Sequence, residues 1–313
     1  MSASTMHADE RPIDAALVRR LLAAQFPRWA GLPIERFASS GTVNALFRLG
    51  DDLAVRLPRI AGGAGDVERE HHWLPRLAPA LPVAIPAVLG RGAPGDGFPW
   101  PWTVQRWLDG ENPLEGRVAR PGALAADLVE FIVALRAIEP ADGPPAYRGG
   151  PLWEVDEETR TAIGLLRGSV GTVDTDAATA AWEEALAAPG WDGPQVWVHS
   201  DLMPGNLLVA DGRLSAVIDF GTAGVGDPAC DLIPAWNLLP ASVREDFRAA
   251  LGVDDATWAR GRGWALSMAL IQLPYYRETN PMMAANARHV IDQVLAQRNA
   301  QGKRVGETPE GNA

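Results

Sequence analysis

The sequence predicts an α+β protein with a smaller strand-rich half and a larger helix-rich half. Two observations support this prediction. Short apolar runs bounded by turn residues prevail up to about residue 107, and long amphipathic helical patterns prevail from Pro121 onwards. We therefore expect domains at 1–107 and 108–313, with residues 298–313 forming a polar, glycine-bearing flexible tail.

The first half begins with a helix and continues mainly as strands. Apolar residues at helical spacing predict a helix over 13–26. Two apolar runs, 45–50 and 53–57, are separated by an Asp-Asp turn and predict neighbouring strands. A further short strand is expected within 98–111, before a glycine-bearing turn.

A second helix is expected over 66–77. Asp66 is its predicted N-cap, because a carboxylate there can accept hydrogen bonds from the free N–H groups of the first turn. Pro75 lies inside the pattern and should kink or restart the helix, since proline has no N–H to donate.

The second half is mostly helical. Its first segment, 121–138, reads as a long amphipathic helix. Further helices are expected near 152–168 and 176–188. A compact block of strands and loops follows at 195–220, and residues 231–297 return to helical patterns.

Composition limits the classes of function. Of the 313 residues, 47% are hydrophobic, which is enough for one large domain or two modest lobes. The 39 acidic residues outnumber the 28 Lys and Arg residues, giving a formal net charge of −11. This balance disfavours nucleic acid, whose phosphates need cationic side chains. It suits a cationic small molecule, and simple solubility explains it equally well.

Cysteine count and hydropathy bear on the compartment. The single cysteine, Cys230, excludes a disulfide framework within the chain and should be a small buried residue. No stretch approaches the roughly 18 apolar residues needed to span a bilayer, so we expect no membrane partner and a cytoplasmic location. The sequence does not define an oligomeric state.

The segment with the most chemical information is VWVHSDLMPGNLLVADGRLSAVIDFG, residues 196–221. A first strand should end at His199, and Asp201 follows in a loop broken by Pro and Gly. Asn206 opens a second strand, and a third strand delivers Asp219 at its end. Two acids and one amide from adjacent strand ends can thus meet in one cleft.

These residue types fit phosphoryl transfer. That reaction needs metal ions on the phosphates and a carboxylate that orients the attacking hydroxyl and accepts its proton. Asp201 is the candidate base. Asn206 and Asp219 offer the hard oxygen ligands that Mg²⁺ prefers.

The same segment carries a family resemblance. H-x-D-x-x-x-x-N followed by D-F-G resembles the protein-kinase signature. HSDLMPGN, AVIDFG and GDPACDL resemble the aminoglycoside phosphotransferase family, whose wider kin include choline, homoserine and fructosamine kinases. The resemblance spans roughly residues 30–295. It implies a protein-kinase-like fold, with a small antiparallel-sheet lobe and a larger helical lobe, and transfer of the γ-phosphoryl group of ATP or GTP to a hydroxyl of a small molecule.

The resemblance also implies residues that bind the nucleotide. Arg56 stands where kinases have a lysine, and it should contact phosphate, although arginine differs from lysine in reach and geometry. Glu70 shares a helix face with two core leucines, so it should point inward and pair with Arg56, whereas Glu68 should be solvated. The loop that covers the nucleotide would include Ser40 and Gly41, and the backbone that bonds the purine edge would lie at Gln105, Arg106 and Trp107.

Two residues are expected to support the site without moving protons. The resemblance assigns His199 to packing and hydrogen bonding, and Asp231 to bracing the backbone of the catalytic loop. Asp227 should cap its own turn locally.

The acceptor pocket is expected between Asp201 and the helices after residue 150. Acids there could bind amines, and aromatic faces could hold cations or sugar rings. The same stretches also read as an ordinary helix start and helix end. The candidate residues are Glu154, Glu157, Tyr275, Tyr276 and Glu278.

Four functions can be compared on the sequence. The first is an antibiotic kinase acting on an aminoglycoside or a similar compound, and the second is a metabolic kinase acting on an amino alcohol or sugar. The third is a catalytically dead nucleotide-binding module, which the Arg56 departure would suit. The fourth, a Ser-His-Asp hydrolase around Ser200, is disfavoured because adjacent residues of an extended chain point in different directions and no G-x-S-x-G elbow exists.

Overall fold

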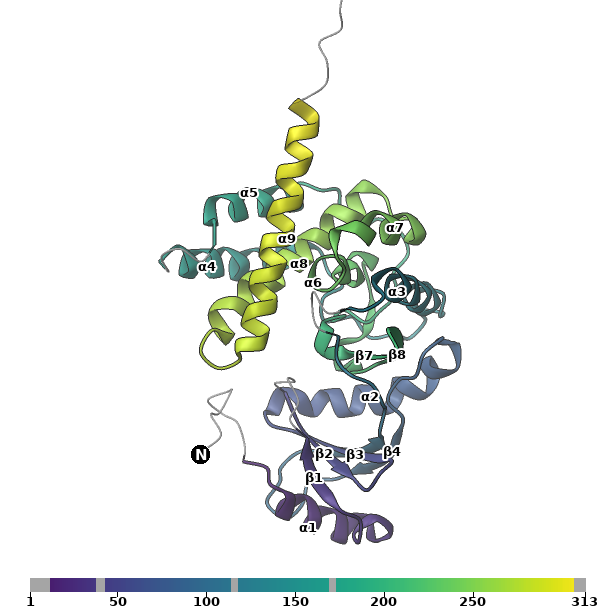
Figure 1. Ribbon diagram of the computed structural model, residues 1–313. Coiled ribbons are helices and arrows are strands. Elements are labelled where there is room, and N and C mark those ends of the chain that lie inside the picture. The colour runs from purple at the N-terminus through teal and green to yellow at the C-terminus, as the bar shows by residue number, and fades with distance from the viewer. Residues whose placement is uncertain (1–11, 38–42, 114–117, 169–172, 307–313) are drawn as a thin grey trace, which may run out of the picture.

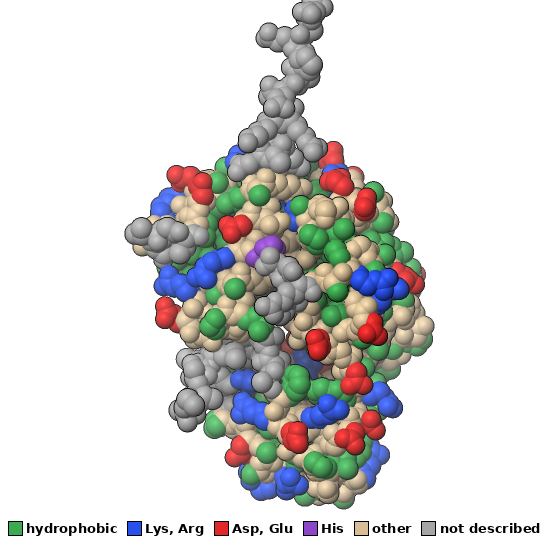
Figure 2. Space-filling model, in the orientation of Figure 1, with side chains coloured by type: hydrophobic (Ala, Val, Ile, Leu, Met, Phe, Trp, Pro, Cys, Tyr) green, Lys and Arg blue, Asp and Glu red, His purple; other side chains and the backbone are tan. Residues whose placement is uncertain are grey.

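The computed structural model describes residues 12–37, 43–113, 118–168 and 173–306, and side chains up to residue 298. The chain forms two lobes (Figure 1), and the surface is hollowed where they meet (Figure 2). Strand β5 ends at Arg106, and the described residues that follow it, 107–113, contain no helix or strand.

The small lobe is built on an antiparallel five-stranded sheet. Its order is β1-β2-β3-β5-β4, and every neighbouring pair is antiparallel. The strands are β1 (Ile34–Phe37), β2 (Asn44–Leu49), β3 (Leu53–Pro58), β4 (Val88–Gly92) and β5 (Trp102–Arg106). Strands β2, β3 and β5 lie where the sequence predicts them, whereas β1 and β4 were not predicted.

The two faces of the sheet differ in chemistry. Along β3, Val55 and Leu57 are fully buried in a core shared with helix α1 (Ala15–Gln25). Side chains alternate along a strand, so Arg56 between them points to the opposite face. Helix α2 (Ala64–Leu77) covers that face, lying between the sheet and the helical lobe (Figure 1).

Helix α2 ends at the predicted residue but differs from its prediction at its start and at Pro75. It begins earlier, with Gly63 as N-cap, so Asp66 lies in the first turn and is not the cap. The helix also continues through Pro75 to Leu77. Proline is tolerated here because only one backbone hydrogen bond, close to the end of the helix, is lost.

The large lobe is mainly helical. Helices α8 and α9 pack along one another, and α4 and α5 lie beside them (Figure 1). Helix α9 extends past residue 298, where the flexible tail was expected to begin. The helices are α3 (Pro121–Arg136), α4 (Asp156–Arg167), α5 (Thr175–Leu186), α6 (Pro234–Asn237), α7 (Ala241–Leu251), α8 (Asp255–Tyr276) and α9 (Pro281–Gly306).

Two small antiparallel strand pairs lie at the edge of the large lobe that faces the cleft. Strands β7 (Leu207–Ala210) and β8 (Arg213–Val217) form the hairpin expected from the sequence. Strand β6 (Val196–Val198) was also expected, but its partner β9 (Gly224–Gly226) was not.

The hydrophobic core divides unevenly between the lobes. The sheet and α1 share one cluster, whereas Leu74 and Leu77 of α2 belong to the larger cluster of the helical lobe. Trp73 of α2 stacks against Trp197 of β6 with ring centroids 4.9 Å apart. Helix α2 therefore joins the lobes through apolar contact as well as through the polar site described below. No helix in the described part of the chain is long and apolar enough to cross a membrane.

Candidate active site

Asp201 and Asn206 are joined directly by hydrogen bonds. Asn206 donates through Nδ2 to the Asp201 carboxylate at 2.8 Å and to the Asp201 carbonyl at 2.9 Å. A 3₁₀ turn at Pro204–Asn206 between β6 and β7 brings the two residues together. Because Nδ2 is used in this way, the amide oxygen of Asn206 remains available as an acceptor or metal ligand.

His199 fixes the loop from inside the protein. Its Nε2 lies 3.0 Å from the carbonyl of Ile218, and its Nδ1 accepts from the N–H of Asp201 at 3.3 Å. A carbonyl can only accept and an amide can only donate, so the ring is neutral with its proton on Nε2. Fully buried and committed on both nitrogens, His199 is suited to holding Asp201 in place and not to carrying a proton.

Asp231 braces the same loop from behind. Its two oxygens accept from the N–H groups of His199 at 2.9 Å and Ser200 at 2.8 Å. Burial raises the pKa of this carboxyl, and the hydrogen bonds from the backbone N–H groups of His199 and Ser200 oppose the shift. Ser200 has φ +63°, a conformation that non-glycine residues rarely adopt, and the Asp231 contacts help to hold it. Cys230 beside Asp231 is buried, as expected.

Asp219 lies next to Asn206 through the backbone. Residue Ile218 donates its N–H to the carbonyl of Asn206 at 2.9 Å, which places the end of β8 against the catalytic loop. The backbone of Asp219 adopts the left-handed conformation, with φ +65°. The following Phe220 is buried, packs edge-on against His199 at 4.7 Å, and donates its N–H to Glu70 at 3.1 Å.

Arg56 connects the small lobe to Asp219. Its Nη1 lies 2.5 Å and 2.7 Å from the two oxygens of Glu70, and its Nη2 lies 2.5 Å from Asp219 Oδ1. Glu70 is buried, with 1% of its side chain exposed, whereas 52% of Glu68 is exposed. The inward-pointing Glu70 and the Arg56–Glu70 pair therefore have the geometry expected from the sequence.

The charges of this group depend on one another. Burial by itself would lower the pKa of Arg56, but Asp219 and Glu70 together raise it above its usual value. Burial raises the pKa of Glu70, and Arg56 opposes that shift. The guanidinium therefore stays charged between two carboxylates, where a triphosphate can compete for it.

Asp66 is a third carboxylate near this group. Burial raises its pKa to about 6, with Asp219 adding to the shift and Arg56 opposing it. A Cβ on Gly221 would lie 2.6 Å from Asp66 Cγ, so the glycine of D-F-G gives this side chain its space.

Sequence reasoning missed two contacts of the site. Asn44, at the start of β2, can turn its amide oxygen to accept from Nε and Nη2 of Arg56 at 3.1 and 2.9 Å. Arg148 donates through Nη1 to Asp201 Oδ1 at 3.0 Å and to the Ser200 carbonyl at 3.2 Å. Arg148 lies in a proline- and glycine-rich loop, and only its basic side chain there could have signalled it.

The expected purine-binding backbone is partly occupied by other segments. The N–H groups of Arg106 and Trp107 donate to the carbonyls of Ala87 at 3.0 Å and Asp52 at 2.7 Å. The Gln105 side chain faces Glu70, with its Nε2 3.4 Å from Oε2. The expected nucleotide-covering residues Ser40 and Gly41 lie outside the described residues.

The acceptor candidates are mostly exposed. Glu154 folds its carboxylate onto Gly150, and Glu157 is exposed near the start of α4. Tyr275 is 53% exposed and stacks on Tyr276 at the end of α8. The Glu278 side chain is 84% exposed, beside Arg277. The connection between α8 and α9, drawn in yellow-green, lies on the side of the large lobe facing the small lobe (Figure 1).

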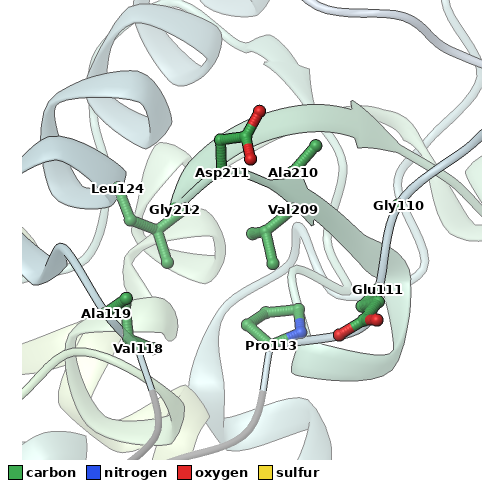
Figure 3. A pocket seen from close by; sticks show the side chains of 10 residues that line it. All are labelled: Gly110, Glu111, Pro113, Val118, Ala119, Leu124, Val209, Ala210, Asp211 and Gly212. Atoms are coloured by element: carbon green, nitrogen blue, oxygen red, sulfur yellow. The ribbon is translucent and has the colours of Figure 1, made fainter.

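A cavity of about 580 Å³ lies apart from this chemistry. It is bounded by the segment after β5, the β7–β8 turn and the start of α3 (Figure 3). Its walls contain neither the acids nor the arginines described above. They are formed by Gly110, Glu111, Pro113, Val118, Ala119, Leu124, Val209, Ala210, Asp211 and Gly212.

The fold and the site together define a kinase-like protein with a small sheet lobe and a larger helical lobe. A model of the phosphotransferase enzyme family matches residues 34–264. The chain therefore belongs to the phosphotransferase enzyme family.

Relatives of known function resemble parts or all of the chain. An aminoglycoside 3'-phosphotransferase from Escherichia coli is 32% identical over 109 residues, which cover 28% of this chain and 38% of that protein. The GDP and kanamycin complex of APH(2")-IIia aligns with a TM-score of 0.71 at 20% identity, covering 90% of this chain and 98% of the other.

A macrolide kinase has the same fold. The apoenzyme of macrolide 2'-phosphotransferase MphH from Brachybacterium faecium aligns with a TM-score of 0.56 at 21% identity, covering 96% of this chain and 100% of the other. At such identities, these structures show the shared fold.

Proposed function

We propose that this protein transfers the γ-phosphoryl group of ATP or GTP to a hydroxyl group of a small molecule. The observation that carries the proposal is the joined network of Asp201, Asn206, Asp219 and Arg56 at the junction of the lobes. The network supplies a base, two hard oxygen ligands and a phosphate-binding cation in one place. Membership of the phosphotransferase enzyme family supports the same reaction.

Asn206 and Asp219 fit a magnesium ion. The amide of Asn206 is oriented by its Nδ2 bonds, so its oxygen is the atom left to face a cation. Asp219 contributes a carboxylate, and Mg²⁺ commonly takes one or two protein ligands with the remaining positions filled by phosphate and water. The bound ion would neutralise charge on the phosphates.

The chemical roles follow from positions. Asp201 accepts the proton of the acceptor hydroxyl as the new O–P bond forms and the bond to the β–γ bridging oxygen breaks. The products are a phosphomonoester and a nucleoside diphosphate. Arg56, held by Glu70, binds phosphate oxygens as a planar donor.

Purine recognition is assigned to the segment after β5. Since the N–H groups of Arg106 and Trp107 are engaged, the next donor is Leu108, whose N–H makes no hydrogen bond within the described residues. We assign the purine edge to this N–H and to neighbouring carbonyls.

The acceptor class is proposed as an aminoglycoside or a similar antibiotic. The net charge of −11 and the exposed acids and aromatic rings near the cleft suit a cationic, ring-bearing compound. Kanamycin and GDP occur in a related structure. A reaction that consumes ATP or GTP also fits the cytoplasmic location expected from the sequence. A metabolic amino alcohol or sugar is the alternative acceptor.

The Asp201→Ala variant tests the assigned base. We expect phosphoryl transfer to fall by about 10²–10⁴-fold, because the hydroxyl loses its proton acceptor, while Mg–ATP or Mg–GTP still raises the melting temperature. Phosphate transfer to a panel of aminoglycosides, macrolides, amino alcohols and sugars is measured for both proteins. The exposed Glu245→Ala serves as a control. Equal transfer rates in Asp201→Ala and wild type would contradict the assignment.

A further inference from the structure

A loop segment of the large lobe lies against the catalytic loop as an added strand. Residues 144–149, the strap, run beside β9, which pairs with β6 on its other side. Val225 donates its N–H to Pro144 at 2.8 Å and accepts from Ala146 at 3.0 Å. Gly149 accepts from the N–H of Asp227 at 2.9 Å. Backbone hydrogen bonds therefore hold the strap along its length.

Close backbone contact fixes the position of the strap. A Cβ on Gly224 would lie 2.4 Å from the Pro144 carbonyl oxygen, and a Cβ on Gly226 would lie 2.6 Å from Gly149 Cα. Glycine at these positions lets the two chains approach. The strap is thus placed by backbone geometry, and its side chains project from a defined position.

Arg148 is the strap residue that reaches the candidate base. Its Nη1 donates to Asp201 Oδ1 at 3.0 Å and to the Ser200 carbonyl at 3.2 Å. Both partners of the ion pair are about one fifth exposed, so solvent reaches it only partly. The guanidinium also lies 4.9 Å from the ring centroid of Tyr147.

Asp201 is consequently held through both of its oxygens. Asn206 donates to Oδ2 from the catalytic loop, and Arg148 donates to Oδ1 from the strap. Two donors from different elements fix the plane of the carboxylate, which a single donor would leave free to rotate. The orientation of a base determines whether its lone pair meets the hydroxyl proton.

We propose that Arg148 is a positioning residue of the transfer reaction, which orients Asp201 to accept the proton of the acceptor hydroxyl. This inference rests on the proposed function. The proton passes from the hydroxyl to Asp201 as the O–P bond forms and the bridging O–P bond breaks, and Arg148 itself neither gains nor loses a proton.

Arg148→Ala tests the role by its effects on kcat and KM. We expect kcat to fall about 100-fold with the KM for Mg–ATP little changed, since the variant misorients the base and leaves the phosphate contacts intact. Arg148→Lys should restore part of the rate, because one donor remains. Millimolar guanidinium chloride should restore part of the Arg148→Ala rate at concentrations that leave wild type unchanged.

Arg69→Ala is the matched control. Arg69 also holds the strap, but its hydrogen bonds go to the backbone carbonyls of Pro145 and Ala223, at 3.3 Å, and not to Asp201. If Arg148 serves only to hold the strap, the two variants should lose activity and thermal stability in parallel. A retained kcat in Arg69→Ala beside a lost kcat in Arg148→Ala supports the positioning role, and parallel losses overturn it.

A double-mutant cycle separates this inference from the proposed function. In the Asp201→Ala background, removing Arg148 should cause no further loss of transfer, and an additional 100-fold loss would overturn the proposal. Should wild type transfer phosphate to no acceptor, the proposed function fails. The pairing is then judged from melting temperatures: non-additive losses in the Arg148→Ala and Asp201→Ala cycle support it, and additive losses overturn it.

Discussion

At the residue scale, Arg56 shows how an arginine is accommodated in the proposed phosphate site, at a position where kinases have a lysine. A lysine has one nitrogen, whereas Arg56 uses separate nitrogens for Glu70 and Asp219. Asn44 can add a third partner on the same guanidinium. The surroundings of Arg56 are therefore matched to a planar donor, and arginine and lysine should not be interchangeable here.

Arg56→Lys should weaken nucleotide binding. We expect the KM for Mg–ATP to rise about tenfold, equivalent to roughly 1.4 kcal/mol, because one ammonium cannot hold Glu70 and Asp219 and still meet phosphate. Steady-state kinetics with varied nucleotide measure the change. Arg91→Lys, on the edge strand β4 and 45% exposed, should leave the KM unaltered. A KM unchanged in both variants would show that Arg56 does not contact the triphosphate.

Residues joined along the chain were easier to predict than residues joined in space. Asp201, Asn206 and Asp219 lie within one short motif, so their spacing alone indicated that they could meet. Glu70 followed from helical periodicity. Arg148 reaches Asp201 from 53 residues away through a loop without periodicity, and no local pattern could indicate that contact.

At the element scale, Asp127 fastens the β7–β8 hairpin to helix α3. Its carboxylate accepts from Arg213 at 2.5 to 3.0 Å and from the buried N–H of Leu214 at 2.9 Å. These hydrogen bonds hold the pKa of Asp127 below its ordinary value of 3.8, and those from Arg213 have the largest effect. Since β8 leads to Asp219, this anchor also helps to place the proposed metal ligand at the end of the strand.

Asp127→Ala should lower the free energy of unfolding by about 1–3 kcal/mol near neutral pH, mainly because the Leu214 N–H loses its partner. A carboxyl group whose pKa is lower in the folded state stabilises the fold at pH values above its unfolded-state pKa. This stabilisation is lost as the pH falls through the folded-state pKa. The difference from wild type should therefore shrink below about pH 4. Urea unfolding of both proteins at a series of pH values measures this difference in the free energy of unfolding. Asp176→Ala, whose side chain is 91% exposed, should stay within about 0.5 kcal/mol at every pH.

Gly226→Ala should destabilise the protein by about 1–3 kcal/mol. The new Cβ would lie 2.6 Å from the Cα of Gly149, and backbone on both sides leaves little room to adjust. In contrast, Gly164 lies within α4, and a Cβ added there would have nothing within 4 Å. Gly164→Ala should therefore stabilise the protein by about 0.5–1 kcal/mol. Urea midpoints that move in the same direction for both variants would contradict the close approach of strap and strand.

The elements with clear apolar patterns were predicted, and those defined by pairing were not. Strands β2 and β3 show apolar runs with a turn between them, and α1 and α3 show helical stripes. Strand β9 is Gly-Val-Gly, and its extended state depends on β6 and the strap on either side. The sequences of such strands have little intrinsic preference for the extended conformation, because strand propensity largely reflects packing on neighbouring strands.

At the scale of the whole molecule, the two apolar clusters need not unfold together. One comprises α1 and the sheet, and the other comprises the helical lobe with α2. Regions with separate cores often exchange amide hydrogens as separate cooperative units. We expect amides of β2 and β3 to exchange as one group and those of α8 and α9 as another, measured by hydrogen exchange with mass spectrometry.

Mg–ATP should slow exchange in both groups, since the proposed nucleotide site includes Arg56 from the sheet and Asp219 from the large lobe. Protection confined to one group would contradict a nucleotide site shared by the lobes. The uneven division of cores was not predictable from sequence, because α2 precedes β4 and β5 in the chain yet packs its leucines into the other lobe.

The Trp73–Trp197 pair gives the protein an internal optical probe. One indole belongs to α2 and the other to β6, with their planes inclined at 60°. Any movement of α2 relative to β6 when a nucleotide binds would change the spacing of these rings and so their emission. The chain has twelve tryptophans, so the contribution of this pair is isolated by comparing wild type with Trp73→Phe. Movement of α2 against β6 can thus be followed in time by intrinsic fluorescence, without attaching a dye.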